Sequence, residues 1–292
     1  DSNTVCFTTD SFVVKPLFFN GGDIGKLAIC GTVNDLAVAG AKPVALSLSL
    51  IIEEGLEFEK FEKILQSAAD TAKAAGIEIV TGDTKVVEAG AADGIFINTA
   101  GIGTKQISGS MSFNKIKPGD KIIINGTIGD HGMTIISQRE GIKFESQLES
   151  DCACLSGLIG DILAQSPDIK FMRDPTRGGA AATLNEIATA SGCSIEINET
   201  DLPVNPTVRA AAEMLGFDLL DIANEGKVII VASPESSDAI LKACKKHPLG
   251  KDACILGTVT EIESDPVVEL VTKIGGRRII QMPYGRELPR IC

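Results

Sequence analysis

The stretch Ile77-Glu78-Ile79-Val80-Thr81-Gly82-Asp83-Thr84-Lys85 indicates how the first third of the chain folds. Its first four residues include three with β-branched side chains, which predicts a short buried strand. Thr81–Lys85 then follow that strand as a polar segment. A helix is predicted immediately before it, over 58–75, because apolar residues recur at helical spacing and Gly76 can end the helix.

The sequence on either side of this stretch extends the pattern. Strands are expected over 5–14, 45–52 and 95–101, and a helix is expected over 24–39 with Asp23 as its N-cap. The first ~105 residues therefore have the order β-α-β-α-β-β. Residues 108–120 are polar and end in Pro118-Gly119, where we place a domain boundary.

The second half of the chain mixes helices and strands without strict alternation. Helices are expected over 155–165, 178–191, 206–215 and 236–245, and a Gly-rich turn over 126–132 precedes a helix that ends at Arg139. Strands are expected over 121–125, 169–172, 194–197, 228–232, 253–258 and 267–271. We therefore predict an α+β protein with two domains, 1–107 and 108–281, and an exposed, flexible tail over 282–292.

Composition excludes several classes of function. The chain has 292 residues and a net charge of −12, and no cluster of Lys and Arg could neutralise nucleic-acid phosphates. No apolar run approaches the ~20 residues of a membrane span, and no signal peptide opens the chain. The eight cysteines show no Cys-x-x-Cys pair, so we expect reduced thiols in a soluble, cytoplasmic protein. The chain opens without Met, which indicates a fragment or a processed product.

Three acidic residues of the first half stand out by their setting. Asp10 lies within a predicted strand, Asp35 lies beside the apolar stripe of a predicted helix, and Asp83 follows a predicted buried strand. A carboxylate near a core is costly unless it is paired or binds a cation. With Lys85 as a phosphate partner, the three fit a Mg-nucleotide site. The alternative is three unrelated residues: a turn residue, a helix residue paired with a nearby Lys, and a cap.

The second half supplies further candidates, each with a structural alternative. Asp174-Pro175-Thr176-Arg177-Gly178-Gly179 enters a helix, so it either binds an anion or simply begins that helix. Glu225, in Asn-Glu-Gly-Lys, is a general base or a turn residue. His131 is a base, a helix cap or a phosphate contact.

The last residue, Cys292, has an unusual position. A thiol at the end of a flexible tail can enter a site, be modified and leave again. The alternative is an incidental terminal thiol.

The motifs together resemble the HypE family of hydrogenase maturation proteins, within the aminoimidazole ribonucleotide synthetase (PurM-like) superfamily. The resemblance covers essentially the whole chain. It rests on 7–11, 16–19, 31–35, 80–87, 129–132, 174–179, 224–227 and the ending Pro289-Arg290-Ile291-Cys292.

This resemblance implies the fold and the partners. The N-terminal domain would dimerise so that sheets from two copies form a barrel, the C-terminal domain would be an α/β sandwich, and ATP would bind between the domains. HypF would carbamoylate Cys292. The chain would then use ATP and Mg²⁺ to dehydrate the S-carboxamide to a thiocyanate. The cyano group would pass through the HypC–HypD complex to the iron of [NiFe] hydrogenase.

The resemblance also implies roles for particular residues. Cys292 would carry the substrate, Glu225 or His131 would act as the base, and Lys85 would assist phosphoryl transfer. Asp10, Asp35 and Asp83 would hold the metal. The nucleotide-binding set would be Asp10, Asn34, Asp35, Thr81, Gly82, Asp83, Lys85, Asp174 and Arg177.

The chain departs from the family pattern in one respect. Members normally begin with a segment bearing His-Gly-Ser-Gly-Gly, which this chain lacks, so we expect an incomplete ATP site and weak turnover. Two rival functions are a small-molecule kinase or synthetase of the same superfamily, and a non-enzymatic thiol carrier.

Overall fold

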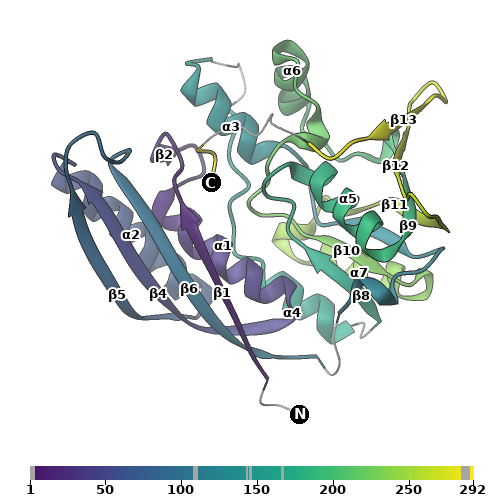
Figure 1. Cartoon of the computed structure of the whole chain (residues 1–292), viewed down its shortest axis with the longest axis horizontal. Coiled ribbons are helices and arrows are strands. Elements are labelled where there is room, and N and C mark those ends of the chain that lie inside the picture. The colour runs from purple at the N-terminus through teal and green to yellow at the C-terminus, as the bar shows by residue number, and fades with distance from the viewer. Residues whose placement is uncertain (1–3, 108–110, 143, 145–146, 166–167, 284–289) are drawn as a thin grey trace.

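A computed structural model describes residues 4–107, 111–142, 144, 147–165, 168–283 and 290–292 (Figure 1). The chain forms two α+β bodies side by side, each built around one main sheet, as the sequence predicted. Among the helices of these residues, none is both long and apolar enough to cross a membrane.

The N-terminal body is a four-stranded sheet in the order β1-β6-β4-β5. Its elements are β1 (Val5–Phe12), α1 (Ile24–Val38), β4 (Ala41–Glu53), α2 (Phe58–Ala75), β5 (Glu78–Val87) and β6 (Ile95–Lys105). A two-stranded ribbon, β2 (Phe18–Phe19) and β3 (Gly22–Asp23), precedes α1. One face of the sheet buries alternate residues against α1 and α2, which also pack against each other.

Helix α1 begins where the sequence predicted. The Asp23 side chain accepts hydrogen bonds from the backbone N–H groups of Gly25 (2.7 Å) and Lys26 (3.2 Å), which satisfies two of the free donors of the first turn. The helix is buried on almost every side, because the sheet, α2 and the C-terminal body all contact it. Polar residues on α1 therefore reach the boundary between the two bodies.

The interpretation of Thr81–Lys85 as a segment after a buried strand is wrong. These residues continue β5, which pairs in parallel with β4 as far as Val87 and is exposed along nearly all its length. β5 is an edge strand that is little covered, so its polar residues do not alternate with buried apolar ones. Because the sequence shows only a short apolar run there, it underestimates the length of the strand.

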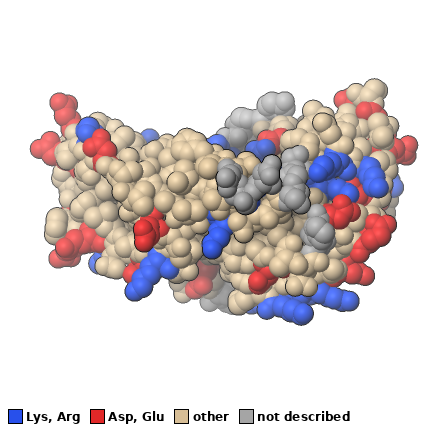
Figure 2. All heavy atoms as spheres, turned by 90° about the horizontal axis from the view of Figure 1, so that it is seen from below, with Lys and Arg blue, Asp and Glu red and all other residues tan. Residues whose placement is uncertain are grey.

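The outer face of this sheet carries several large apolar side chains. Val5, Phe7, Val44, Ile51, Val80 and Ile102 are all more than two-fifths exposed, Phe7 by 69%. Figure 2 shows a broad, largely uncharged surface on this side of the N-terminal body, with acidic side chains gathered at its margin. An apolar patch of this kind is typical of a protein–protein interface.

The C-terminal body has a seven-stranded sheet in the order β13-β12-β9-β11-β7-β10-β8. The strands are β7 (Lys121–Ile124), β8 (Ile169–Arg173), β9 (Cys193–Asn198), β10 (Ile229–Ala232), β11 (Cys254–Ile262), β12 (Val268–Val271) and β13 (Arg277–Ile280). The helices are α3 (Asp130–Arg139), α4 (Ser156–Gln165), α5 (Gly179–Ser191), α6 (Pro206–Leu215) and α7 (Pro234–Lys246).

Both faces of this second sheet are covered. On β7, Ile122 and Ile124 pack with residues of α5, while Ile123 between them packs with α4 and α7. Because neighbouring side chains of a strand point to opposite faces, a continuous apolar strand needs helices on both sides. The C-terminal body is therefore an α/β sandwich, as expected.

Asn34 on α1 joins the two bodies. Its side-chain N–H₂ donates to the carbonyls of Ala153 (3.0 Å) and Glu225 (3.2 Å), and its Oδ1 accepts from Leu155 N (2.7 Å). All three partners belong to the C-terminal body. This one buried amide fixes the segment before α4 and the turn at Glu225 against the N-terminal domain.

We predict that Asn34→Ala destabilises the protein by about 2–4 kcal/mol, because it breaks three hydrogen bonds and leaves buried backbone groups unpaired. Thermal unfolding of the variant should show a clearly lower Tm. Asn185→Ala, which removes two bonds within the C-terminal body, is the matched control and should cost less. An unchanged Tm for Asn34→Ala would contradict this role.

Candidate active site

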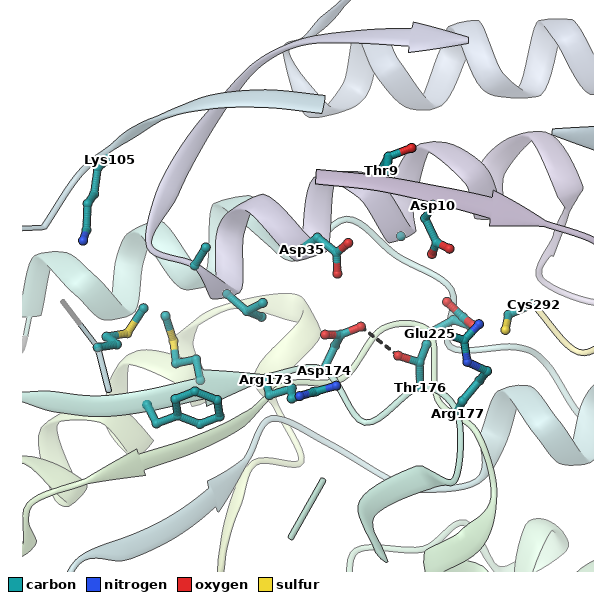
Figure 3. Close-up of a pocket in the computed structure, with 16 residues that line it drawn as sticks. Thr9, Asp10, Asp35, Lys105, Arg173, Asp174, Thr176, Arg177, Glu225 and Cys292 are labelled. Carbon is teal, nitrogen blue, oxygen red and sulfur yellow. Dashed lines mark hydrogen bonds between the residues drawn. The ribbon is translucent and has the colours of Figure 1, made fainter. Parts of the chain in front are cut away.

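A cavity of about 510 Å³ lies between the two bodies. The N-terminal body contributes residues of β1 and α1, including Asp10 and Asp35. The C-terminal body contributes the segment after β8, with Asp174 and Arg177, and the turn at Glu225. Figure 3 shows these side chains around one space, with Cys292 near Glu225 and Arg177 at one end.

Four carboxyl groups line this cavity, and burial together with their proximity raises the pKa values of Asp10, Asp35 and Glu225. Burial raises the pKa of Asp35 to about 6, and the charges of Asp174 and Asp10 add to that rise. Burial also raises the pKa of Asp10, where the charge of Asp174 adds to the effect. Like charges that share a poorly solvated space disfavour ionisation, so a cation bound here would be stabilised by all of them.

Glu225 is the most buried of the four, with 4% of its surface exposed. Burial raises its pKa well above the usual range, and the nearby Cys152 thiol and several carboxylates add to this. Its Oε1 is buried and has no hydrogen-bond partner among the described residues. A buried carboxyl oxygen without a partner is costly, which indicates that a ligand completes its environment.

The backbone around Glu225 is held from three sides. Glu225 N donates to Asp151 Oδ1 (3.1 Å), whose other oxygen pairs with Lys227 Nζ (2.9 Å), and the Glu225 carbonyl accepts from Asn34. Gly226 allows this packing, since a Cβ there would lie 1.8 Å from the Asp151 carbonyl oxygen. These contacts fix the position of the turn, and the Glu225 side chain lines the cavity.

The segment Asp174–Gly179 lies opposite the N-terminal carboxylates. The Thr176 hydroxyl donates to Asp174 Oδ2 (2.9 Å), as Figure 3 shows, and Arg177 lies beside the cavity. Gly178 and Gly179 have φ values of +70° and +59°, and a Cβ on Gly179 would lie 2.4 Å from the Leu220 carbonyl oxygen. The glycines thus let α5 begin directly behind Arg177.

The chain end is bound in the structure. Ile291 is only 6% exposed and packs in an apolar cluster to which both bodies contribute, and Val13 N donates to the backbone oxygen of Cys292 (3.1 Å). In this conformation Ile291 is buried and Cys292 is half-buried, whereas Arg290 is exposed, as expected of the tail. Residues 284–289 of the predicted tail lie outside the described residues.

His131 lies against this bound end. Its Nε2 is 2.7 Å from the Ile291 carbonyl oxygen and its Nδ1 is 2.8 Å from Ser150 Oγ. Since a carbonyl oxygen only accepts, Nε2 carries the proton and Nδ1 accepts from the serine hydroxyl. Burial lowers the pKa of His131, so the ring is neutral at pH 7. With both nitrogens engaged, the geometry favours a tail-holding role over that of a base.

Asp83 and Lys85 are not brought to the cavity of their own chain. They lie on β5, at the opposite edge of the sheet from Asp10 on β1. The register pairs Asp83 with Ser49 and Lys85 with Ile51, which places both on the outer face of the sheet. There the Lys85 ammonium bonds both Asp83 oxygens (2.9 and 2.7 Å) and lowers the pKa of Asp83.

Of the other residues expected to bind the nucleotide, some line the cavity and some lie elsewhere. Asn34 uses its polar atoms to join the two bodies, and Thr81 and Gly82 lie on β5 with Asp83. Asp10, Asp35, Asp174 and Arg177 all line the cavity.

No three His, Cys, Asp or Glu side chains of the described residues are arranged to hold a metal ion on their own. Mg²⁺ that accompanies a nucleotide needs only one or two carboxylates, the remaining ligands being phosphate and water. The oxygens of Asp10 and Asp35, with raised pKa values, fit that requirement.

Sequence reasoning missed Asp93, Arg139 and Asp151. Asp151 pairs with Lys227 and holds Glu225, and Asp93 and Arg139 contact the chain end. The only signal of their importance is spatial, since each acts on residues far away in the sequence.

We predict that Asp35→Asn stabilises the metal-free protein at pH 7.5 by roughly 2–4 °C in Tm. The folded-state pKa of about 6 exceeds the ordinary 3.8, so stability is greatest with Asp35 protonated and is lost as pH rises through 6. The gain should therefore disappear near pH 4.

Thermal unfolding at the two pH values checks this, with Asp83→Asn as the control. Asp83 is exposed and its pKa is lowered, so that variant should not gain stability at pH 7.5. An Asp35→Asn variant that gains nothing at either pH would contradict the electrostatic account.

Comparisons with known proteins place this chain in a family. The N-terminal and C-terminal domain models of AIR synthase related proteins match residues 1–105 and 117–268. The chain is 50% identical over 286 residues to carbamoyl dehydratase HypE of Rhizobium leguminosarum bv. viciae, which covers 98% of this chain and 81% of that protein.

Solved structures of HypE proteins show the same relationship. A HypE–HypF complex superposes with a TM-score of 0.92 at 50% identity, covering 96% of this chain and 90% of that one. HypE in complex with ATP superposes with a TM-score of 0.95 at 43% identity, covering 100% and 88%. The resemblance read from the motifs is thereby confirmed at the level of the family. The chain belongs to the AIR synthase related proteins and, among them, to the HypE carbamoyl dehydratases.

Proposed function

We propose that this protein dehydrates an S-carboxamide on its own Cys292 to a thiocyanate, at the expense of ATP. The observation that carries the proposal is the position of the chain end. Cys292 lines the same cavity as Glu225, the buried carboxyl with an unpaired oxygen. A substrate bound through the chain itself needs no separate association step, so its reaction is effectively unimolecular.

The reaction balances as a phosphorylation followed by an elimination. The carboxamide oxygen attacks the γ-phosphorus of ATP and ADP leaves, which converts a poor leaving group into a phosphate ester. The N–H protons and the phosphate then depart, and a carbon–nitrogen triple bond forms. Glu225 accepts a proton from this nitrogen, since its raised pKa makes it a strong base once it is ionised.

The nucleotide would lie in the cleft between the two bodies. A second cavity of about 570 Å³, with Phe217 and Ile222 in its lining, shares Arg177 and Cys292 with the first. This second cavity would suit the aromatic ring of the nucleotide, and Arg177 would then face the phosphates. Asp10 and Asp35 would hold Mg²⁺, which supplies neutralisation of charge on the transferring phosphoryl group.

The partners follow from the same chemistry. A carbamoyltransferase must load Cys292, and the HypF bound in a related structure is the partner we assign to that step. The HypC–HypD complex would receive the cyano group. All of these steps would take place in the cytoplasm, with reduced thiols.

A homodimer would unite the remaining site residues. The exposed apolar face of the N-terminal sheet would pair with the same face of a second copy, closing two sheets into a barrel. Asp83 and Lys85 lie on that face, so within a dimer they would reach the active-site cavity of the partner copy and not that of their own chain. Each active site would then combine Asp10 and Asp35 of one copy with Asp83 and Lys85 of the other.

The first test follows the mass of carbamoylated protein by intact-mass spectrometry. With MgATP, the wild type should lose one water, about 18 Da, from the peptide that ends in Cys292, and release phosphate, at the weak turnover expected above. Glu225→Gln should slow this step at least about 100-fold, because the variant lacks the base.

Glu269→Gln is the control and should react normally, because Glu269 lies on β12 and pairs with Arg277, and neither residue lines the cavity. Phosphate release without any loss of mass would contradict the dehydration and would favour a small-molecule kinase. Carbamoylated protein that neither loses mass nor hydrolyses ATP would favour a thiol carrier.

The second test asks whether active sites are shared between copies. Asp35→Asn and Asp83→Asn should each be inactive as homodimers. Co-expressed, they should recover about a quarter of wild-type activity, because half the dimers are mixed and each has one intact site. No recovery, with both single variants inactive, would place the two residues in one chain's site. Full activity of Asp83→Asn alone would remove it from catalysis.

A further inference from the structure

Three cysteines gather at a second place where the two bodies meet. Cys30 lies on α1, and Cys152 and Cys154 lie on the segment before α4. The Sγ atoms of Cys30 and Cys154 are 3.4 Å apart, a hydrogen-bond distance for sulfur, and the Cys152 thiol also contacts Cys30. Residues 124 positions apart in the sequence thus bring two thiols together.

The three thiols differ in how far solvent reaches them. Cys30 and Cys152 are buried, with 1% and 2% of their surfaces exposed, whereas Cys154 is half-buried. All three line a cavity of about 580 Å³ between α1, α2 and the start of α4, and this cavity shares no lining residue with the candidate active site. A small reagent that enters the cavity therefore reaches Cys154 before the two buried thiols.

The surroundings of Cys154 favour its ionised form. A hydrogen bond from the Cys30 thiol lowers the pKa of Cys154, and the charge of Lys26, one turn before Cys30 on α1, lowers it further. For Cys30 the opposite holds, because its hydrogen bonds with Cys152 and Cys154, together with burial, raise its pKa. Since the thiolate is the reactive form of cysteine, the pair has one nucleophilic sulfur and one protonated neighbour.

A metal centre does not fit these sulfurs. Over the described part of the chain, no group of three potential ligands has the arrangement that an ion requires, and these cysteines are included in that statement. A metal ion also needs its cysteine ligands deprotonated, whereas the environment of Cys30 keeps that thiol protonated. The chemistry that suits two thiols in contact is oxidation.

We propose that Cys154 and Cys30 are a peroxide-reactive thiol pair whose disulfide links the two bodies covalently. The Cys154 thiolate attacks one oxygen of hydrogen peroxide, the O–O bond breaks, and hydroxide leaves and takes up a proton to form water. The resulting sulfenic acid is attacked by the Cys30 sulfur, which loses its proton as the S–S bond forms and the sulfenic oxygen leaves as water. Two thiols are oxidised, and one peroxide is reduced to two waters.

The disulfide acts on the junction that joins the two bodies. Cys30 lies one turn before Asn34 on α1, and Cys154 lies between Ala153 and Leu155, the two residues whose backbone groups bind the Asn34 amide. The covalent bond fastens α1 to the segment before α4 at the same place. Because it closes a loop of more than a hundred residues, it restricts the unfolded chain strongly and raises the resistance to unfolding.

The direct test treats the reduced full chain with hydrogen peroxide, blocks the remaining thiols with iodoacetamide in denaturant, and maps crosslinked peptides by mass spectrometry. The main product should be a disulfide between Cys30 and Cys154 that dithiothreitol reverses. Cys154 should be lost at least about tenfold faster than Cys254, a half-buried cysteine outside this cluster, because burial raises the pKa of Cys254 to about 11. A main crosslink through Cys152, or equal rates for Cys154 and Cys254, overturns the proposal.

Two variants separate the two chemical steps. In Cys30→Ala, the sulfenic acid on Cys154 should still form but lack its partner, so dimedone should trap it. Cys154→Ala should give neither the adduct nor the disulfide, and Cys254→Ala, the matched control, should form the disulfide as the wild type does. If Cys30→Ala gives no dimedone adduct on Cys154, the proposed order of steps is wrong.

Thermal unfolding tests whether the disulfide joins the bodies, and it requires neither ATP nor carbamoylated Cys292. The oxidised wild type should have a Tm about 5 °C or more above that of the reduced protein, and dithiothreitol should remove the gain. Cys30→Ala treated with peroxide should show no gain. An unchanged Tm in the crosslinked wild type, or an equal gain in Cys30→Ala, would contradict the covalent link between the bodies.

Discussion

The confinement of the Glu225 carboxyl between two domains is the constraint on which the rest of the structure depends. Its backbone is fixed by Asn34 from α1 and by Asp151 from the segment before α4, while Oε1 has no hydrogen-bond partner among the described residues. Such a group is costly to bury, and raised pKa values at Asp10 and Asp35 show that the cost extends through the cavity. Arg173 and Arg177 offset part of the charge of these carboxylates, and a bound cation would offset more of it.

Local signals predicted most of the fold. The helix over 24–38 was placed to within one residue, since its cap, Asp23, acts on its own first turn, and the helix over 206–215 was placed between a proline and a glycine. The strands β5 and β13 were underestimated or missed, because edge strands exposed to solvent lack the apolar alternation that marks a buried strand. Such strands are defined by pairing with distant segments.

The residues of the candidate site could be predicted from the sequence, but their arrangement in space could not. The motifs supplied Asp10, Asp35, Asp174, Arg177, Glu225 and Cys292, and the structure gathers all six around one cavity. Sequence spacing could not show that Asp83 and Lys85 point away from it, because that follows from the register of β5 on β4. Nor could it show that Asp93 and Arg139 contact the chain end, because those contacts join residues more than a hundred positions apart.

The central claim is that ATP activates the oxygen of a carboxamide carried by Cys292. The most direct measurement labels that carboxamide oxygen with ¹⁸O and follows the label after a single turnover with MgATP. The account predicts that the label appears in inorganic phosphate, since the carbon–oxygen bond breaks after the oxygen has joined phosphorus. Label found in water or retained on the protein, with thiocyanate formed, would contradict it.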